Sequence, residues 1–412
     1  MSRLPAGAPV ASSVGAPVAT PVAAPVGTPV GAGRRVLHLT TVHPRDDIRI
    51  FRKECVSLAR AGYDVVQVVG DGQGDAVVDG VRIVDIGARP AGRLARMRRQ
   101  PALALAAARR ERPELVHLHD PELLPVGVAL ARDGLPVVYD AHEDVPRQVL
   151  TKQWIAAPLR PLVARAFEAY ENRQVRRLAA VAAATPHIGE RFGPIARRSV
   201  VVGNYPFTEE LAPDAAAAAG AAAARERMVC YVGGLMRTRG LLTMVRAAAR
   251  VPGLRLVLCG RFEDAAFEAE LRSEPGWAQV DFRGQVGRAE VRDVLARARA
   301  GLVTLLPLPS YRDSLPIKMF EYMSAALPVV ASDFPLWRGI VERHGCGLCV
   351  DPADAAALAA AIVHIVDDDA AVARMGAAGR AAVLSEYHWP RAEAALLALY
   401  GELLGAAAGR AP

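Results

Sequence analysis

Two carboxylates and a lysine lie close together in the segment Asp313-Ser-Leu-Pro-Ile-Lys-Met-Phe-Glu-Tyr-Met323. A helix that begins at Pro316, with Ser314 as its cap, would place Lys318 and Glu321 on one face. The Glu321 carboxylate can accept hydrogen bonds from the vicinal hydroxyls of a ribose, and Lys318 beside a helix N-terminus favours an anion. These two properties side by side suit a sugar nucleotide. The alternative is an ordinary amphipathic surface helix with a solvated ion pair.

A glycine turn in the same half of the chain is a second candidate for phosphate binding. The segment Tyr231-Val-Gly-Gly-Leu-Met-Arg-Thr-Arg-Gly240 follows a predicted strand and opens a predicted helix over residues 241–250. Gly233 and Gly234 would let the backbone approach a ligand closely, and Arg239 adds a permanent charge. We therefore expect Arg239 and Lys318 to face one diphosphate, whereas Arg237 reads as a solvated side chain.

Further polar residues follow other predicted strands. Gly260 ends the strand before Arg261, a position that often borders a nucleotide base. In the first half, His117-Leu-His-Asp-Pro-Glu122 and Tyr139-Asp-Ala-His-Glu-Asp144 each end a strand. Both clusters should border the same cleft, which makes His119 a candidate for acceptor contact. Neither cluster has a companion with clear metal-ligand spacing, and a lone histidine is more often structural, so no metal site is predicted.

Strands and helices alternate along both halves, which predicts right-handed βαβ units and parallel sheets. The α/β fold class follows, with two facing sheets and a cleft at the carboxyl ends of their strands. The predicted domains cover residues 34–205 and 206–388, and the last segment, 389–405, is helical in pattern. The expected elements are strands at 34–39, 63–69, 115–119, 136–139, 228–232, 254–258, 301–306 and 328–331, and helices at 51–62, 123–132 and 241–250.

Composition limits the class of protein. The chain has 412 residues, of which 52% are hydrophobic and 23% charged, so two globular domains are expected. Residues 1–33 repeat alanine, proline and valine, and proline at this frequency predicts a disordered tail rather than a signal peptide or a membrane span. Five cysteines do not make a disulfide framework, so a reducing cytoplasm is the expected location. The lone Cys346-x-x-Cys349 pair reads as part of a buried strand.

The basic excess of the chain, a formal net charge of +7, lies in the first half. Arginines alternate with apolar residues at Arg93, Leu94, Arg96, Met97, Arg98, Arg99, Leu103 and Leu105. This pattern is typical of a basic amphipathic segment at an anionic membrane surface, and an ordinary arginine-rich surface is the equal alternative. Nucleic acid is not expected as a partner, because no recognised binding motif accompanies the charge.

The chain resembles the retaining, nucleotide-sugar-dependent glycosyltransferases of family 4. The resemblance covers roughly residues 35–400 and is strongest in the Gly-Gly-Leu-x-x-x-Arg-Gly turn, in 316–323 and in Pro328-Val-Val-Ala-Ser-Asp333. It implies the GT-B fold of two facing Rossmann-like domains, with the C-terminal helix returning to the first domain. The first domain would bind the acceptor and the second the donor.

The resemblance also implies roles for individual residues. The family's Glu-x7-Glu pattern appears here as Asp313-x7-Glu321, so Glu321 would hold the ribose hydroxyls. Asp313, with the backbone of Ser314, Leu315 and Pro316, would lie near the transferred sugar or its phosphate. Arg239 takes the place of the family's usual phosphate-binding lysine, and a family histidine close to the donor sugar maps to His142.

The chain departs from the family pattern at three places. Many members carry an arginine where this chain has Gly234, and aspartate at position 313 shortens the reach to the sugar. The first strand is followed by His43-Pro-Arg-Asp-Asp-Ile-Arg49 instead of a Gly-Gly phosphate loop. Asp46, Asp47 and Arg49 therefore become candidates for acceptor or sugar contact, and a capped loop is the alternative.

The function implied by the resemblance is transfer of a hexosyl group from a nucleotide diphosphate sugar to a hydroxyl. Arg239, Lys318 and helix dipoles would offset the charge of the leaving diphosphate, so no metal cofactor is expected. The expected acceptor is a glycan or a lipid-linked sugar, in cell-envelope or exopolysaccharide synthesis. The alternatives are an epimerase or inverting transferase of the same fold, and an inactive nucleotide-sugar-binding scaffold.

Overall fold

The computed structural model describes residues 31, 33–152, 154–212 and 225–408. The tail predicted over residues 1–33 lies outside these residues except for Gly31 and Gly33, and it stays a prediction. The alanine-rich stretch over 215–224 also lies outside them.

Within the described residues, the first sheet has eight strands in the order β3-β4-β2-β1-β5-β6-β7-β8. All neighbours are parallel except β3 and β4. The chain builds outward from β1 on one side and then returns to β5 on the other, so the switch point lies between β1 and β5. The strands are β1 (Arg35–Leu39), β2 (Asp64–Val69), β3 (Ala76–Val78), β4 (Val81–Asp85), β5 (Leu115–Leu118), β6 (Val137–Ala141), β7 (Ala180–Ala183) and β8 (Ser199–Val201).

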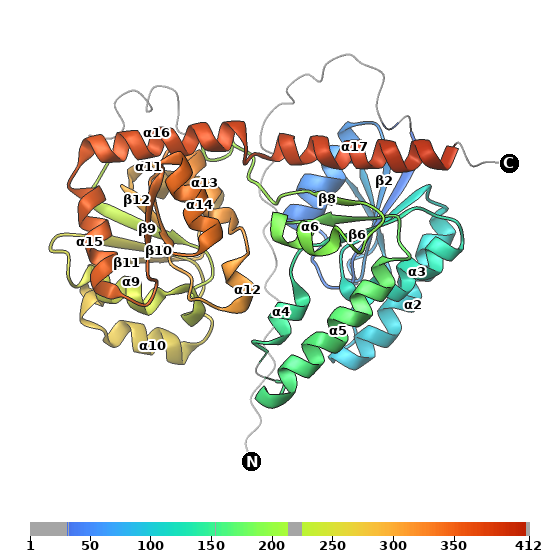
Figure 1. The fold of residues 1–412 in the computed structure, drawn as a ribbon, viewed down its shortest axis with the longest axis horizontal. Helices are drawn as coiled ribbons and strands as arrows, with labels where there is room; N and C mark the ends of the chain where they lie inside the picture. Colours follow the sequence, from blue (N-terminus) through green and yellow to red (C-terminus); the bar gives the residue numbers. More distant parts are fainter. Residues whose placement is uncertain (1–30, 32, 153, 213–224, 409–412) are drawn as a thin grey trace.

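Helices cover both faces of this sheet (Figure 1). One face packs against α2 (Arg93–Glu111), α3 (Leu124–Arg132), α5 (Arg160–Val175) and α6 (Pro186–Phe192). The other face packs against the π-helix η1 (Ile48–Cys55), α1 (Val56–Arg60) and α17 (Trp389–Ala408). Short helices η2 (Pro121–Leu123), α4 (Val145–Val149) and η3 (Ala157–Leu159) lie in the connections.

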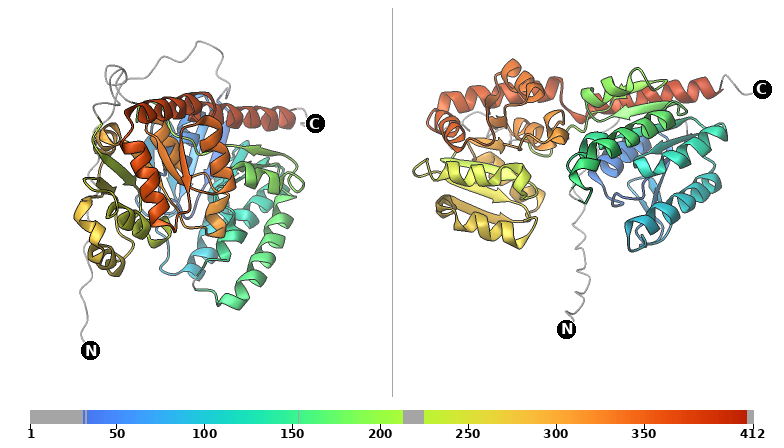
Figure 2. Two further views of the ribbon diagram at one scale, coloured as in Figure 1. Left: turned by 60° about the vertical axis from the view of Figure 1, so that its left-hand side comes forward. Right: turned by 60° about the horizontal axis from the view of Figure 1, so that its bottom comes forward.

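The second sheet has six parallel strands among the described residues, in the order β11-β10-β9-β12-β13-β14, with its switch point between β9 and β12. The strands are β9 (Met228–Val232), β10 (Arg255–Cys259), β11 (Val280–Gly284), β12 (Ala300–Val303), β13 (Val329–Ser332) and β14 (Gly347–Val350). The helices around them are η4 (Arg237–Arg239), α9 (Leu241–Ala248), α10 (Ala265–Ser273), η5 (Pro275–Gln279), α11 (Arg288–Arg297), α12 (Pro309–Arg312), α13 (Ile317–Ser324), α14 (Pro335–His344), α15 (Ala355–Val366) and α16 (Asp369–Ser385). The two lobes stand side by side in Figure 1 and in the right view of Figure 2.

The predicted α/β class with two facing parallel sheets is confirmed. Two local predictions are wrong. The helix expected from Phe51 to Gly62 begins earlier, because the Asp47 side chain caps it by accepting hydrogen bonds from the following backbone amides. It starts as the π-helix η1 and continues as α1 from Val56. Ser314 does not cap α13, because its hydroxyl donates to the Tyr311 carbonyl and the helix begins after Pro316 without a side-chain cap.

The C-terminal helix α17 packs on the first sheet although it follows the second (Figure 1). Its first residue, Trp389, is fully buried, donates from Nε1 to the Ser57 hydroxyl at 2.9 Å, and lies under the Lys53 ammonium. The Trp389 amide also donates to the Pro206 carbonyl at 3.0 Å, so the two crossings between the lobes lie side by side. No described helix is both long enough and apolar enough to span a bilayer.

Substitutions on the buried and the exposed face of α17 should differ in their effect on the free energy of unfolding. We expect Trp389→Ala to lower the free energy of unfolding by about 3–5 kcal/mol, because it leaves a large cavity and an unpaired Ser57 hydroxyl. Glu402→Ala, on the exposed side of α17, should change it by less than about 0.5 kcal/mol. Urea unfolding of the full chain measures both, and equal effects would contradict this view of the helix.

Candidate active site

A cavity of about 1090 Å³ lies between the two halves. It forms where the carboxyl ends of the first sheet's strands face the segment that follows β12 and leads into α13. The predicted site residues that line it are Asp47, Arg49, His119, His142, Arg239, Asp313, Ser314, Leu315 and Pro316. The predicted residues that do not line it are Asp46, Gly233, Gly234, Gly260, Lys318 and Glu321.

The Arg49 guanidinium is held by hydrogen bonds within the first half of the chain. Its guanidinium is buried and binds the Asp140 carboxylate through Nε at 3.0 Å and Nη2 at 2.7 Å. The remaining nitrogen, Nη1, donates to the Val202 carbonyl at 2.8 Å, and Nε lies 3.1 Å from Glu54 Oε1. All three nitrogens have partners within the protein, but Arg49 also lines the cavity, so its predicted contact with acceptor or sugar stays a prediction.

His142 lines the cavity next to the ion pair of Arg49 and Asp140. Its Nε2 lies 3.4 Å from Asp140 Oδ2. Burial lowers the pKa of His142 to about 3, with Arg49 adding to the effect and Asp140 opposing it, so the imidazole is neutral at physiological pH. Asp140 stays ionised despite its burial, because the Arg49 guanidinium and the hydrogen bond from His119 hold the pKa of its carboxyl well below the usual range.

The loop after β1 contributes an acid and a histidine to the same wall. Asp47 caps η1, accepting from the amides of Arg49 at 2.8 Å and Ile50 at 2.9 Å. Against the effect of burial, the His43 side chain and the Ile50 amide lower the pKa of Asp47 to about 2. His43 also lies 3.4 Å from Asp120, so it is positioned between two carboxylates. Asp47 therefore has a capping role in the structure, which was one of the two alternatives.

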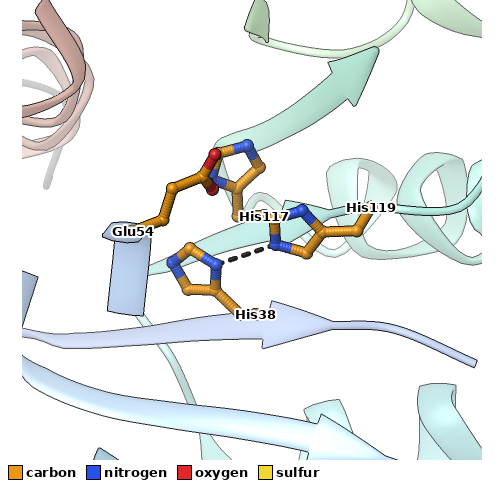
Figure 3. A group of neighbouring side chains, drawn as sticks. All are labelled: His38, Glu54, His117 and His119. Carbon is orange, nitrogen blue, oxygen red and sulfur yellow. Dashed lines mark hydrogen bonds and ion pairs between the residues drawn. The ribbon is translucent and has the colours of Figure 1, made fainter. Parts of the chain in front are cut away.

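Histidines behind this wall were not foreseen as a group. His38 on β1, His117 on β5 and His119 just after β5 are all buried, and Glu54 of η1 lies beside them (Figure 3). His38 and His117 are register partners on neighbouring strands, which puts their side chains on the same face of the sheet. The sequence shows alternating polar residues in 115–119, but nothing local indicates that His38 joins them.

On the second-half side, behind the residues that line the cavity, glycines bring backbone close to a lysine. Gly233 follows β9 with a φ of +136°, and a Cβ there would lie 2.8 Å from Lys318 Nζ. Gly260 follows β10 with a φ of +150°, and a Cβ there would collide with the Gly233 carbonyl. Gly234 has no such restriction, since its Cβ would meet only the Met236 side chain at 3.7 Å.

Lys318 and Arg239 form a concentration of positive charge. Lys318 Nζ lies 3.8 Å from the centre of the Tyr231 ring, and the Arg239 guanidinium lies 4.9 Å from that of Tyr311. Burial and the charge of Arg239 lower the pKa of Lys318 well below its ordinary value, while Glu321 opposes the shift. Lys318 and Arg239 therefore lie within electrostatic reach of each other, as a shared anion would require.

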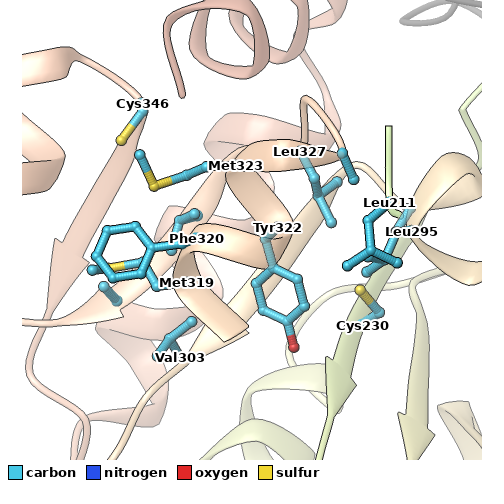
Figure 4. Packing of buried hydrophobic residues seen from close by; sticks show 14 of the residues in the cluster. Leu211, Cys230, Leu295, Val303, Met319, Phe320, Tyr322, Met323, Leu327 and Cys346 are labelled. Carbon is cyan, nitrogen blue, oxygen red and sulfur yellow. The ribbon is translucent and has the colours of Figure 1, made fainter. Parts of the chain in front are cut away.

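Helix α13 is anchored by the core and carries Lys318 and Glu321. Met319, Phe320, Tyr322 and Met323 pack inward among apolar neighbours (Figure 4). Glu321 is paired with Arg288, whose Nη1 donates to Oε1 at 2.8 Å, rather than with Lys318. The alternative of a solvated ion pair between Lys318 and Glu321 is therefore wrong. Glu321 also does not line the cavity.

Asp313 lies where the halves meet. Its carboxylate is half exposed, and Oδ2 lies 4.0 Å from His187 Nε2 of α6 in the other half. The following loop is held by Trp337, whose Nε1 donates to the Ser314 carbonyl at 2.6 Å. His187, which the sequence did not single out, thus joins the cavity wall together with Asp144, 3.5 Å away.

Two first-half residues lie elsewhere than the sequence predicted. Asp46 is exposed and lines a separate, smaller hollow with Arg45 and Asp71. Arg96, expected at a membrane surface, instead binds Glu122 at 3.0 Å on the cavity wall, because α2 turns this face towards the end of β5.

Family models match both halves of the chain. Residues 49–205 match the glycosyl transferase 4-like domain, and residues 215–382 match the glycosyl transferases group 1 model. The chain belongs to the GT-B glycosyltransferases. It is 26% identical to a glycogen synthase of Mycobacterium tuberculosis over 414 residues, covering 90% of each chain.

Solved structures of the same fold resemble the enzyme along most of its length. Sucrose-phosphate synthase from Thermosynechococcus elongatus matches with a TM-score of 0.73 at 21% identity, covering 90% of this chain and 100% of that one. Anabaena HepE in complex with UDP-glucose matches with a TM-score of 0.64 at 16% identity, covering 89% and 99%.

The two adjacent glycines of the enzyme should tolerate alanine very differently. Gly233→Ala should cost about 1–3 kcal/mol of stability, because its φ is unfavourable for a side chain and Lys318 must move away. Gly234→Ala should be neutral or slightly stabilising, by up to about 1 kcal/mol. Chemical denaturation compares the two variants directly, and similar losses in both would refute the close approach of Lys318 to Gly233.

Proposed function

We propose that the enzyme transfers a hexosyl group from a nucleotide diphosphate sugar to a hydroxyl of a glycan or lipid-linked sugar, with retention at the anomeric carbon. The observation that carries this proposal is the pair of cations Lys318 and Arg239 beside the close backbone turn at Gly233. A half-buried lysine next to a second cation is stabilised by an anionic ligand, and a diphosphate has the charge and the length to contact both.

The donor would lie along the second sheet's switch point. The diphosphate would contact Lys318 and Arg239, with the N-terminal ends of α9 and α13 directed at it. Glu321 would accept hydrogen bonds from the ribose after exchanging its Arg288 contact, and Gly260 would border the base. Binding of UDP-glucose by the structurally similar HepE supports a nucleotide sugar as the ligand.

The transferred sugar would reach the cavity between the halves. Asp313 and the backbone of Ser314, Leu315 and Pro316 would lie on one side of it, and His142 on the other. In the reaction the bond from the anomeric carbon to the diphosphate oxygen breaks, and a bond to the acceptor oxygen forms on the same face. The acceptor proton passes to the leaving phosphate oxygen, so no protein nucleophile is required. Positive charge from Lys318, Arg239 and the helix ends would offset the leaving group without a metal.

An exposed apolar tip beside the cavity supports a membrane-bound acceptor. The turn before α5 and its first residues expose Trp154, Leu159, Leu162 and Val163, and Leu162 is 66% exposed. Exposed Lys152 and Arg165 flank these residues (Figure 1 shows the lower end of α5). Apolar residues with basic neighbours suit the inner face of an anionic plasma membrane, where a lipid-linked sugar of envelope or exopolysaccharide synthesis would be presented.

Neighbouring arginines allow a matched test of donor binding. Arg239→Gln should weaken UDP-glucose or GDP-mannose binding about 10- to 100-fold, because a charged hydrogen bond to phosphate is lost. Arg237→Gln removes the same charge from the same turn, but Arg237 is exposed and paired with Glu270, so affinity should stay within about twofold. Calorimetry measures both, and an unchanged affinity in Arg239→Gln would remove the basis of the proposal. NMR of the product then establishes its anomeric configuration.

Sedimentation with vesicles tests the membrane surface. Leu162→Glu should reduce binding to anionic vesicles roughly tenfold or more, because it removes an inserting apolar group and adds a repelled charge. Leu384→Glu is the matched control, because Leu384 is also exposed, by 51%, but lies on α16 in the other half. This variant should bind anionic vesicles as the parent does. Equal binding of both variants would argue against this tip as the contact, and absence of binding by the parent would favour a soluble acceptor.

A further inference from the structure

The histidines behind the cavity wall form a continuous chain with Tyr400 of α17. Tyr400 and the three histidines are at most 1% exposed. The distances between successive polar atoms are 2.9 Å from His117 Nδ1 to the Tyr400 hydroxyl, 3.0 Å from that hydroxyl to His38 Nε2, and 2.8 Å from His38 Nδ1 to His119 Nε2. The last link joins His119 Nδ1 to Asp140 Oδ2 at 3.1 Å. Each distance is that of a hydrogen bond.

The protons of this chain can be placed one by one, starting from Asp140. An ionised carboxylate only accepts, so His119 must carry its proton on Nδ1 and accept on Nε2. His38 then donates from Nδ1 and accepts on Nε2, and the donor to that nitrogen is the Tyr400 hydroxyl.

The remaining link follows in the same way. The Tyr400 oxygen accepts from His117 Nδ1, which leaves His117 Nε2 as a bare acceptor. His117 Nε2 is a buried atom without a hydrogen-bond partner, as expected for the outer end of such a chain. Burial lowers the pKa values of His38 and His117 well below the ordinary value, which agrees with neutral rings.

We propose that His117, Tyr400, His38 and His119 form a one-directional hydrogen-bond chain that ends on Asp140, and that Tyr400 is a positioning residue for the His142 side of the cavity. Asp140 Oδ2 accepts from His119 and from Arg49 and lies 3.4 Å from His142 Nε2. A carboxylate held by these donors keeps one orientation towards His142. The C-terminal helix thereby contributes to the geometry of the transfer site without touching the substrates.

A bound divalent metal is the rival explanation of the same cluster. The ligand atoms of His38, Glu54, His117 and His119 lie within 4.8 Å of one another (Figure 3). Two imidazoles on a tetrahedral metal place their nitrogens about 3.4 Å apart, given metal–nitrogen bonds of about 2.1 Å. The 2.8 Å between His38 Nδ1 and His119 Nε2 is too short for that and suits a shared proton.

Histidine tautomers give a direct test that does not depend on activity. In the full chain labelled with ¹⁵N-histidine, long-range ¹H–¹⁵N correlation spectra should show three neutral rings protonated on Nδ1, the form less favoured by free histidine. Their resonances should shift in Tyr400→Phe and not in Tyr63→Phe. Protonation on Nε2 in any of the three rings, or one equivalent of tightly bound metal by elemental analysis, would overturn the proposal.

Kinetics test the positioning role, which rests on the proposed transfer reaction. Tyr400→Phe should lower kcat about 2- to 10-fold, the equivalent of one hydrogen bond, with the donor KM unchanged. Tyr63→Phe is the matched control, because Tyr63 is also buried, packs edge-on against Tyr400 at 5.7 Å, and lies outside the chain. Equal kcat values in the two variants would reject the positioning role. If no donor is turned over at all, the proposed function fails while the tautomer result still decides the chain.

Discussion

The buried ion pair between Arg49 and Asp140 organises the first half of the enzyme. It joins η1, the end of β6 and the segment after β8, three parts of the chain that are far apart in sequence. Leaving either partner alone in the interior would carry a large desolvation cost, so the two positions depend on each other. His119, His142 and the cap of η1 all take their places relative to this pair.

The two walls of the cavity differ in their electrostatics. On the first-half wall, buried histidines are held neutral around one ionised carboxylate. On the second-half side, Arg239 lines the cavity and Lys318 lies behind it, so positive charge gathers beside a packed helix and a glycine turn. A neutral, hydrogen-bonding wall suits a sugar hydroxyl, and a cationic wall suits a leaving phosphate, which is the division of labour that a transfer reaction requires.

Most of the fold could be predicted because its strands are short apolar runs bounded by turn residues. The strand predicted at 228–232 coincides with β9, and the glycine turn after it has the backbone conformation that its sequence suggests. The contacts of the buried charged residues in η1 could not be predicted, because Arg49 and Lys53 bind partners about 150 positions away.

The same limit applies to the site. Residues at strand ends, such as His119 and His142, could be placed at the cavity from the rule that parallel strands share one edge. The contribution of Tyr400 and His38 could not, because it depends on the docking of α17 across the first sheet. At Ser314 the local sequence pattern was misleading. It predicts a helix cap, but the hydroxyl donates to the Tyr311 carbonyl within the loop instead.

The paired crossings between the lobes restrict how the lobes can move. The segment around Tyr205 and the segment around Tyr387 run together, with their rings 5.6 Å apart and the Pro206 carbonyl bonded to the Trp389 amide. A single linker would allow one lobe to rotate freely, whereas two segments that contact each other should act as a hinge with one axis. We therefore expect bending about that axis to open or narrow the gap between His187 and Asp313, and the paired crossings to resist torsion about the long axis of the molecule.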